Sequence, residues 1–143
     1  MAADQLPDPE TPFGKSVRER LASEPLIWLT TIGKDGTPQP NPVWFLHDGD
    51  DIVVYSIASA NRLTHVLQRP RVSLNFNSDD HGGSVVVITG DARLTPDEPA
   101  PDQSPAYMAK YAGPMAGISG TVEKFAATYN VAMRIDIGKV RGF

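Results

Sequence analysis

The sequence predicts a mainly β domain of the α+β class, an antiparallel barrel of six strands with short helices added at its margins. Three observations support this prediction. Short apolar runs rich in β-forming residues follow one another with turn sequences between them. One of these runs alternates strictly between apolar and polar residues, as a half-buried strand does. The helical patterns are few and short, which argues against a parallel sheet built from βαβ units.

The chain is predicted to begin with an arm and a helix. Residues 1–12 contain three prolines and three acidic side chains and almost nothing apolar, so we expect a flexible N-terminal arm there. The ordered, cofactor-binding domain is expected over residues 13–143. Its first apolar side chains, Phe13, Val17 and Leu21, recur every fourth residue with charged residues between them, which predicts a short amphipathic helix.

The next segment changes from helical to strand periodicity. Residues 26–32 are rich in β-formers, residues 34–36 supply turn chemistry, and residues 43–46 resume an apolar run, which together predict a hairpin. Residues 48–50 combine aspartate and glycine and mark another turn. Residues 52–57 are the third predicted strand.

A helix and two further strands follow. Residues 59–69 place apolar side chains on one face and end before Pro70, which predicts a helix. Residues 71–77 are the strictly alternating strand. Residues 84–94 form a longer predicted strand, in which Gly90 marks a bulge or a close approach of two backbones.

The C-terminal part is predicted to contain a loop, two helices and the sixth strand. Residues 95–105 hold four prolines and are predicted to be a loop. Short helical patterns occupy residues 105–111 and 121–129. Residues 132–137 form the last predicted strand, and no internal repeat is present.

The composition excludes several classes of function. The absence of cysteine excludes disulfides, thiolate nucleophiles and CxxC redox pairs. A formal charge of −4 would repel a nucleic-acid backbone, so no nucleic-acid partner is expected. The longest apolar run is far shorter than the roughly 20 residues that span a bilayer. Acidic residues stand where a secretory signal carries basic ones, so we expect a cytoplasmic protein.

No metal site is expected, and the sequence shows no obvious motif of catalytic side chains. His47, His65 and His81 lie in three different predicted elements, and none stands at metal-ligand spacing from another ligand. The sequence contains no GxSxG, GxGxxG or Walker motif, which argues against hydrolases and common nucleotide-binding folds. No catalytic residue is assigned, and any redox chemistry is expected to come from a bound cofactor.

The segment from Tyr55 to Arg62 is a candidate anion site. It joins a predicted strand to a predicted helix, where unpaired backbone N–H groups and the helix dipole favour an anion such as phosphate. Ser56, Ser59, Asn61 and Arg62 add hydroxyl, amide and guanidinium donors. An equally weighted interpretation is that Ser59 is a plain helix cap and Arg62 a solvated surface charge.

A second candidate lies between residues 38 and 45. Prolines at every second position remove N–H groups from one side of the chain, so that side must face an edge, solvent or a ligand. Trp44 and Phe45 then offer faces on which a planar ring system would stack. The alternative, which is slightly favoured on this segment alone, is a proline-protected edge strand with Trp44 in the core.

Taken together, these segments resemble the flavin and deazaflavin split-barrel oxidoreductases, the superfamily of the pyridoxamine 5′-phosphate oxidases. The similarity is greatest to its actinobacterial branch that depends on coenzyme F420. It covers nearly the whole chain from Phe13 onward, and it rests on the joint order and spacing of Leu29-Thr30-Thr31-Ile32, Asp35-Gly36-Thr37-Pro38, Pro42-Val43-Trp44-Phe45, Tyr55-Ser56, Arg62, Arg69-Pro70-Arg71-Val72, Ser73-Leu74-Asn75-Phe76, Gly82-Gly83-Ser84-Val85-Val86-Val87, Gly90, Arg134 and Lys139-Val140-Arg141-Gly142-Phe143.

The resemblance implies a six-stranded antiparallel split barrel of the FMN-binding type, which forms a homodimer with the cofactor in a groove at the subunit interface. The cofactor phosphate is then expected at the strand-to-helix junction. Many relatives have lysine where Arg62 stands, and arginine binds as a planar fork. The implied cofactor-binding residues are Pro42, Val43, Trp44, Phe45, Tyr55, Ser56, Ala58, Ser59, Asn61, Arg62 and Arg141.

The implied activity is that of a coenzyme F420-dependent reductase, which transfers hydride to an unsaturated or conjugated small organic substrate. Two alternatives remain: an FMN-dependent enzyme of the pyridoxamine phosphate oxidase type, and a non-catalytic carrier of F420 or haem. Because F420 has a polyglutamate tail, its groove would require extended positive charge. The candidate basic residues are Arg62, Arg69, Arg71, Lys139 and Arg141, and the alternative is that these charges are dispersed and solvated.

Overall fold

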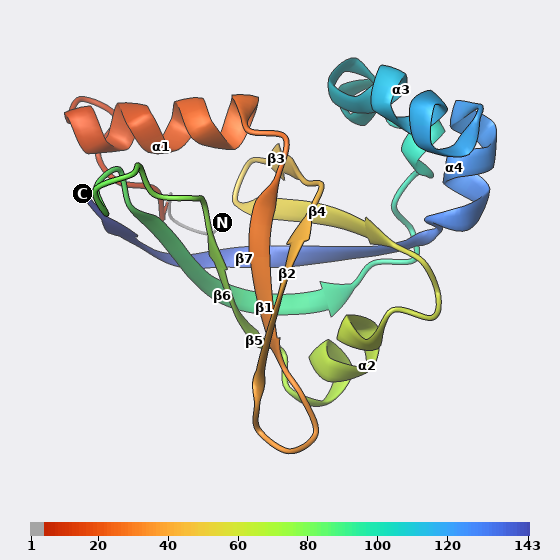
Figure 1. The fold of residues 1–143 in the computed structure, drawn as a ribbon, viewed down its shortest axis with the longest axis horizontal. Coiled ribbons are helices and arrows are strands. Elements are labelled where there is room, and N and C mark those ends of the chain that lie inside the picture. Colours follow the sequence, from red (N-terminus) through yellow and green to blue (C-terminus); the bar gives the residue numbers. More distant parts are fainter. Residues whose placement is uncertain (1–4) are drawn as a thin grey trace.

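The computed structural model describes residues 5–143 and shows a single antiparallel sheet of seven strands, curled into a half-barrel with helices at its margins (Figure 1). The sheet order is β2-β1-β5-β6-β7-β4-β3. The strands are β1 (Ile27–Ile32), β2 (Pro38–Val43), β3 (Leu46–Asp48), β4 (Asp51–Ser56), β5 (Arg71–Asn75), β6 (Val86–Leu94) and β7 (Val131–Gly142). The helices are α1 (Pro12–Ser23), α2 (Asn61–Gln68), α3 (Pro105–Ser119) and α4 (Val122–Thr128), with a 3-10 turn at Pro101–Gln103.

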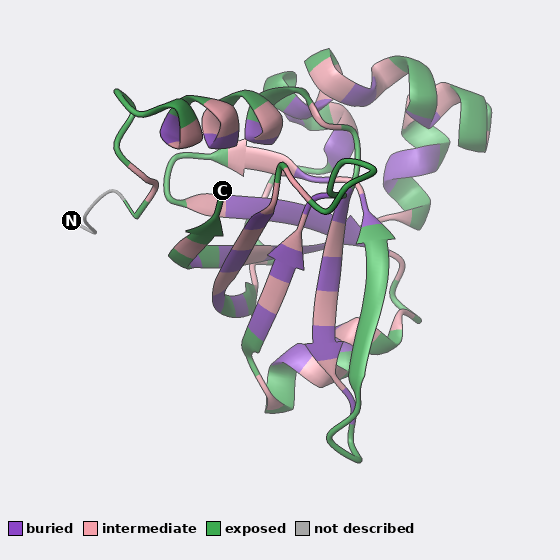
Figure 2. Cartoon of the chain, turned by 60° about the vertical axis from the view of Figure 1, so that its left-hand side comes forward, coloured by how far each residue is buried: buried purple, intermediate pink, exposed green. Residues whose placement is uncertain are grey.

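The predicted fold class is confirmed, but the strand count of six is wrong. The predicted hairpin partner at residues 43–46 is instead split between two short strands. The proline-rich segment β2 pairs with β1, and β3 pairs with β4. The interpretation of this segment as a proline-protected edge strand is confirmed, because a strand at the sheet edge needs N–H groups on one side only. β2 is such an edge, and its outer side is solvent-exposed (Figure 2).

The barrel core is mainly aliphatic and lies on the concave face of the sheet. Along β1 and β5 every second side chain is buried, as the alternation predicts. Leu29, Leu74 and Ile88 from three neighbouring strands are fully enclosed, and Val17 and Leu21 of α1 close one end. Burial of this aliphatic surface holds the sheet in its curl.

The bulge predicted at Gly90 is confirmed. The register between β6 and β7 shifts between Thr89 and Gly90. A Cβ on Gly90 would lie 1.9 Å from the carbonyl oxygen of Asp136, so no larger residue fits this close approach. β7 itself continues to Gly142, beyond the predicted end at residue 137, because its backbone pairs with β6 over that length whatever its exposed side chains are.

The helix α3 is longer than predicted. It begins at the Ser104 cap, whose side chain accepts from the Tyr107 N–H, and it continues past residue 111 through Pro114 to Ser119. Tyr107, Tyr111 and Met115 recur every fourth residue and are buried against the sheet, so tertiary packing outweighs the helix-breaking residues. Together with α4 this helix covers a second, aromatic cluster.

The N-terminal segment contacts the start of α1. Thr11 caps this helix by accepting from the Gly14 N–H, and the Arg18 guanidinium donates to the Pro7 carbonyl at 2.7 Å. Residues 1–4 lie outside the described part of the chain, and flexibility of the arm over 1–12 remains a prediction. None of the helices described in residues 5–143 is long and apolar enough to cross a membrane.

Candidate functional site

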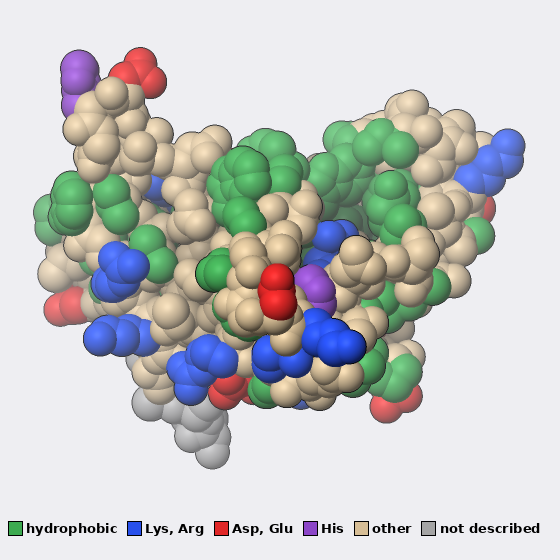
Figure 3. Space-filling view, turned by 60° about the horizontal axis from the view of Figure 1, so that its bottom comes forward, with side chains coloured by type: hydrophobic (Ala, Val, Ile, Leu, Met, Phe, Trp, Pro, Cys, Tyr) green, Lys and Arg blue, Asp and Glu red, His purple; other side chains and the backbone are tan. Residues whose placement is uncertain are grey.

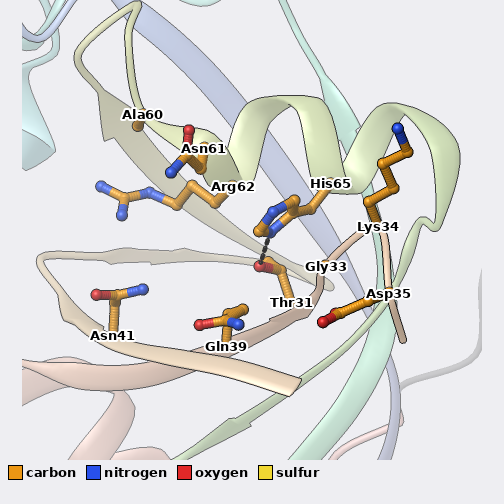
Figure 4. Close-up of a pocket in the computed structure, with 10 residues that line it drawn as sticks. All are labelled: Thr31, Gly33, Lys34, Asp35, Gln39, Asn41, Ala60, Asn61, Arg62 and His65. Carbon is orange, nitrogen blue, oxygen red and sulfur yellow. Dashed lines mark hydrogen bonds between the residues drawn. The ribbon is translucent and has the colours of Figure 1, made fainter. Parts of the chain in front are cut away.

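A polar cleft of about 860 Å³ opens between α2 and the β1–β2 hairpin (Figure 4). The side chains of α2 point into it from one side and those of the hairpin from the other. We call it the polar cleft. Its lining consists of Thr31, Gly33, Lys34, Asp35, Gln39, Asn41, Ala60, Asn61, Arg62 and His65.

The cleft is polar because the inner faces of two paired strands change character along their length. On β1 the buried side chains pass from aliphatic Leu29 to Thr31. On β2, Asn41 lies opposite Leu29 and Gln39 lies opposite Thr31. Val43, at the start of the paired region, is the buried residue of this strand. The aliphatic core therefore ends here, and the same face of the sheet continues as a hydrogen-bonding surface.

Thr31 and His65 form a hydrogen-bonded pair across the cleft floor. The Thr31 hydroxyl is only 1% exposed, and it lies 2.8 Å from Nδ1 of the His65 ring. A buried hydroxyl needs such a partner. This contact fixes the ring of His65 on the inner face of α2, one turn from Arg62, with its remaining nitrogen available to the cleft.

Arg62 is a half-buried cation that forms no ion pair within residues 5–143. Its Nε donates to the buried Ser56 hydroxyl at 3.0 Å. Among residues 5–143, no carboxylate lies within ion-pair distance of it and no group accepts from its two terminal nitrogens. Burial lowers the pKa of the Arg62 guanidinium, an effect that the nearby Tyr129 opposes. A cation held in this way, with two unused donors, is suited to an anionic ligand.

The N-terminus of α2 is open beside Arg62. The cap residue is Ala60, whose methyl group cannot accept a hydrogen bond from the first backbone N–H groups of the helix. Ala58 and Ser59 lie in the exposed turn before it, so the interpretation of Ser59 as a helix cap is wrong. Arg62 is also not a fully solvated charge. The unsatisfied N–H groups and the positive end of the helix dipole add to the attraction for an anion.

Lys34 and Asp35 lie at the far end of the cleft, in the turn of the hairpin. In Figure 4 the His65 ring lies between Arg62 and Lys34 along the cleft. The Asp35 carboxylate accepts from the Thr37 N–H at 3.0 Å, which lowers the pKa of Asp35. The Asp35 carboxylate therefore stays ionised, and this end of the cleft holds a negative charge beside Lys34, whereas the cation at the other end is Arg62.

A second, aromatic pocket of about 240 Å³ adjoins the cleft at Arg62. We call it the aromatic pocket. Trp44 is stacked between Tyr111, at 4.7 Å between ring centroids, and Phe125, at 5.3 Å. Tyr129 stacks on the other side of Phe125 at 4.4 Å. The complete lining is Pro42, Val43, Trp44, Tyr55, Arg62, Tyr107, Ile118, Phe125 and Tyr129.

Tyr55 and Tyr107 of the aromatic pocket are held as neutral phenols. Burial, together with the nearby Glu98, raises the pKa of Tyr55 to about 12. Burial also raises the pKa of Tyr107 well above its ordinary value. Each hydroxyl is therefore a hydrogen-bond donor across the physiological pH range.

The structure brings most of the candidate cofactor residues together around Arg62. Ser56 lies behind Arg62 and orients it, since its hydroxyl accepts from the guanidinium. Phe45 is fully buried in the barrel core and lines neither the cleft nor the aromatic pocket. The candidate residues that line the aromatic pocket are Pro42, Val43, Trp44, Tyr55 and Arg62, and those that line the polar cleft are Asn61 and Arg62. Ala58 and Ser59 line neither cavity and lie in the exposed turn before α2.

The other basic candidates lie elsewhere. Arg141 is exposed and pairs with Val87 near the C-terminal end of β7, which Figure 1 shows at the opposite side from α2. Arg69 donates to the Ile32 carbonyl at 2.9 Å, and Arg71 pairs with Asp91. Figure 3 shows Lys and Arg side chains spread in a band beside a hollow on this side of the molecule, with a histidine and an acidic side chain among them.

Sequence reasoning missed several residues of both sites. Thr31 was not singled out for a site, and His65 was considered only as a metal ligand. Gln39 and Asn41 lay within the candidate segment 38–45 but were given no role, because a hairpin was predicted without the register that pairs β2 with β1. That register would have placed the three hairpin residues on one face. Tyr107, Phe125 and Tyr129 were assigned to short helices, and nothing in their spacing shows that the helices fold onto Trp44. No group of three or more His, Asp or Glu side chains in residues 5–143 could hold a metal ion.

The comparisons with known proteins agree with this architecture. A family model described as pyridoxamine 5′-phosphate oxidase matches residues 13–142. A solved structure described as an F420 reductase is 20% identical over 87% of this chain and 94% of its own, with a TM-score of 0.68. The heme storage protein HutZ from Vibrio cholerae is 13% identical over 92% of this chain and 95% of its own, with a TM-score of 0.63.

A third similar structure comes from Clostridium acetobutylicum. It is described as related to general stress protein 26 and as a member of the pyridoxinephosphate oxidase family. It is 12% identical over 86% of this chain and 79% of its own, with a TM-score of 0.61. At such identities the likeness of these structures shows the fold alone.

The curled antiparallel sheet and its flanking helices define a split-barrel protein. The match over residues 13–142 then makes the assignment specific: the chain belongs to the pyridoxamine 5′-phosphate oxidase family. This family includes oxidoreductases, and its fold binds flavin-type cofactors.

Proposed function

We propose that this protein is a coenzyme F420-dependent oxidoreductase that reduces an unsaturated or conjugated organic substrate. The observation that carries the proposal is Arg62, a half-buried guanidinium with no carboxylate partner in the described part of the chain. It stands between a polar cleft and an aromatic pocket. That arrangement suits a ligand that combines an anionic group with a planar ring system.

The donors of the polar cleft fit a phosphate ester with further anionic groups. The two terminal nitrogens of Arg62 and the open N-terminus of α2 would hold the phosphodiester. His65 adds a ring nitrogen and Lys34 an ammonium group toward the hairpin turn, where a carboxylate of the tail would bind to Lys34. The ring system would lie beside Pro42 and Val43, where the cleft meets the aromatic pocket.

When bound, the deazaflavin supplies hydride, and the residues of this chain supply position and environment. Arg62 fixes the anionic part of the cofactor, while Ser56 fixes Arg62. The stacked rings of Trp44 and Phe125 exclude water from the space next to the junction. Hydride transfer needs close contact in a dry site, and this is the role that the aromatic pocket would have.

We further propose that the active form is a homodimer. Gln39 and Asn41 of the edge strand β2 line the polar cleft, and the outer side of this strand is exposed and lacks N–H groups at its prolines. A second copy that covered this edge would turn the cleft into a closed groove. Arg141 lies away from the cleft of its own chain, and it would reach a cofactor only from the partner copy.

A cofactor titration tests the proposal. Quenching of tryptophan fluorescence by coenzyme F420 and by FMN would be followed in the Trp28→Phe variant, in which only Trp44 beside the junction still reports. We expect tighter binding of F420 than of FMN, and a steeper loss of F420 affinity with added salt, because its tail contacts more of the cleft. Equal affinities, or tighter binding of FMN at low salt, would contradict the F420 assignment.

FMN is the second candidate, because it needs only the anion site at Arg62 and the α2 N-terminus. An FMN-dependent oxidase would bind FMN tightly with a shallow salt dependence. Haem forms a third arm of the titration, since the fold is shared with a heme storage protein. Binding of haem without binding of either flavin-type cofactor would identify a carrier instead.

A further inference from the structure

The hydroxyl of Tyr107, in the aromatic pocket, forms no hydrogen bond within residues 5–143. The residue is only 1% exposed. Its neighbours differ, because Tyr55 donates to the Pro99 carbonyl at 2.6 Å and Tyr111 donates to the Pro25 carbonyl at 2.7 Å. Buried polar groups without partners are rare and costly.

The Tyr107 hydroxyl is not sealed inside the protein. Within residues 5–143, the only fully enclosed side-chain oxygen or nitrogen without a partner is Oγ1 of Thr95. Tyr107 lines the aromatic pocket, so a molecule in that pocket is the group that reaches its hydroxyl. The tyrosine is therefore a free donor at the wall of an otherwise ring-lined space.

The pocket limits the kind of molecule that would bind. Its volume of about 240 Å³ lies below the roughly 300–1,000 Å³ of sites for drug-sized ligands, so it has room for one or two rings. Stacked aromatic walls favour a planar molecule. Arg62 is the single charged side chain in the lining, and the proposed function already uses it for the cofactor anion, so the occupant would be uncharged.

We propose that the aromatic pocket binds a small, neutral, planar conjugated carbonyl compound, and that the Tyr107 hydroxyl donates a hydrogen bond to its carbonyl oxygen. The use of this pocket as the substrate site of a reductase rests on the proposed function. The ligand preference rests on the pocket alone. A donor at the carbonyl oxygen also stabilises negative charge that develops there when the conjugated bond accepts hydride.

Burial favours this role of Tyr107. The raised pKa keeps the phenol protonated, so it donates rather than repels a developing oxyanion. Its ring is fixed by edge contact with Tyr55 at 4.9 Å and by contact with Tyr111 at 4.8 Å. A donor fixed by packing on two sides loses little freedom when a ligand binds.

A matched pair of probes tests the proposal in the protein without cofactor. Coumarin and naphthalene have two fused planar rings of similar shape, but only coumarin carries a carbonyl oxygen. By isothermal titration calorimetry, we expect coumarin to bind about fivefold more tightly than naphthalene, as one neutral hydrogen bond provides. Absence of coumarin binding, or equal affinity for the two probes, would overturn the proposal.

Two tyrosine variants identify the donor. Tyr107→Phe should weaken the binding of coumarin about fivefold and leave the affinity for naphthalene unchanged. The two probes would then bind equally well. Tyr55→Phe is the control, since that hydroxyl lines the same pocket but is already bonded to Pro99. It should preserve the coumarin preference. A loss of preference in Tyr55→Phe, or its retention in Tyr107→Phe, would assign the hydrogen bond elsewhere.

A variant at the mouth of the pocket tests the location without touching the buried tyrosines. Ile118 lines the pocket and is 61% exposed, so Ile118→Trp should fold and should weaken both probes at least tenfold. Unchanged affinities would place the binding site outside the aromatic pocket and overturn the proposal.

Competition separates this inference from the proposed function. We expect saturating F420 to leave coumarin affinity within about twofold, because the cofactor ring lies at the junction and the probe in the pocket. If F420 fails to bind at all, the proposed function fails while the coumarin preference still stands. Displacement of coumarin by F420 would show that the pocket holds the cofactor ring, and it would overturn the inference alone.

Discussion

The polar cleft and the aromatic pocket share Arg62 but depend on the fold in different ways. The side chains that line the cleft belong to β1, β2 and α2. β1 and α2 are held in place by other residues, which pack in the aliphatic core. The walls of the aromatic pocket, by contrast, are themselves the core that attaches α3 and α4 to the sheet. Changes in the cleft should therefore alter ligand affinity, whereas changes in the pocket should alter stability as well.

This difference teaches how the chain separates two kinds of recognition. An anion needs donors that remain exposed until the ligand arrives, and such donors contribute little to the stability of the free protein. A ring needs preformed apolar walls, and forming those walls also buries surface that stabilises the fold. Arg62 lies where the two requirements meet, and it is half-buried for that reason.

The largest expected effect is on stability and lies in the aromatic pocket. Phe125→Ala removes a ring that stacks on both Trp44 and Tyr129 and is 3% exposed. We expect it to lower the free energy of unfolding by about 3–5 kcal/mol, measured by urea denaturation. Ile118→Ala, at an exposed position of the same pocket, is the control and should change it by less than about 0.5 kcal/mol. Similar losses in both variants would mean that the walls are not a core.

The second prediction concerns the cleft. Arg62→Ala should weaken F420 binding about 10- to 100-fold, because it removes a charge-assisted contact with the phosphate. The free energy of unfolding should stay within about 1 kcal/mol of the original, since no ion pair of Arg62 is lost within residues 5–143. Arg62→Lys keeps the charge and should retain much of the affinity. A large loss of stability with intact binding would reverse the comparison between the two regions.

A third prediction uses Lys110, a half-buried cation on the aromatic side. Its ammonium donates to the Phe45 carbonyl at 2.9 Å, and burial lowers the pKa of Lys110 to about 8. The unfolded chain then binds this proton more tightly than the folded chain. Stability should therefore increase from pH 8 to about 10.4, by about 1 kcal/mol for a side chain that is still partly exposed.

Comparison with Lys110→Met isolates this contribution. Urea denaturation at pH 8 and at pH 10 should show a rise in the free energy of unfolding for the original chain relative to the variant. An identical pH dependence in the two proteins would show that the ammonium is not held away from water. In that case Lys110, like Arg62 in the cleft, would cost the folded protein little stability.

The smallest effect is expected at the cleft floor. Thr31→Val keeps the shape of a residue that is 1% exposed but removes its hydrogen bond to His65. We expect a loss of about 0.5–1 kcal/mol in stability and a two- to threefold loss of F420 affinity, because the His65 ring is no longer fixed. Fluorescence titration and urea denaturation measure the two effects. Unchanged affinity would show that His65 does not contact the ligand.

Much of the fold was predictable from local patterns. The alternation through Val72 and Leu74 defined β5, and the fourfold spacing of Val17 and Leu21 defined α1. Gly90 marked the bulge because few other reasons keep a glycine inside a long strand. The junction between the strand that ends at Ser56 and the helix that contains Arg62 was predicted from the change of pattern, and its role as an anion site stays a prediction.

Other features depend on contacts that no local pattern contains. The prolines of β2 suggested an edge, but the register that places Gln39 opposite Thr31 is a pairing of two strands. The length of α3 past Pro114 depends on packing of its tyrosines against the sheet. For the same reason, no sequence pattern indicates that the Tyr107 hydroxyl has no hydrogen-bond partner within residues 5–143.

The sequence by itself determined the order of most elements, the antiparallel sheet and the clustering of hydrogen-bond donors in residues 55–62, because these follow from side-chain periodicity and from residues close together in the chain. Only the tertiary structure decided that Arg62 has no ion-pair partner among residues 5–143, that His65 faces the cleft and that aromatic rings from β4, α3 and α4 enclose a pocket beside it. Those properties depend on contacts between residues that are distant in the sequence, and such contacts form only when the sheet and helices have packed.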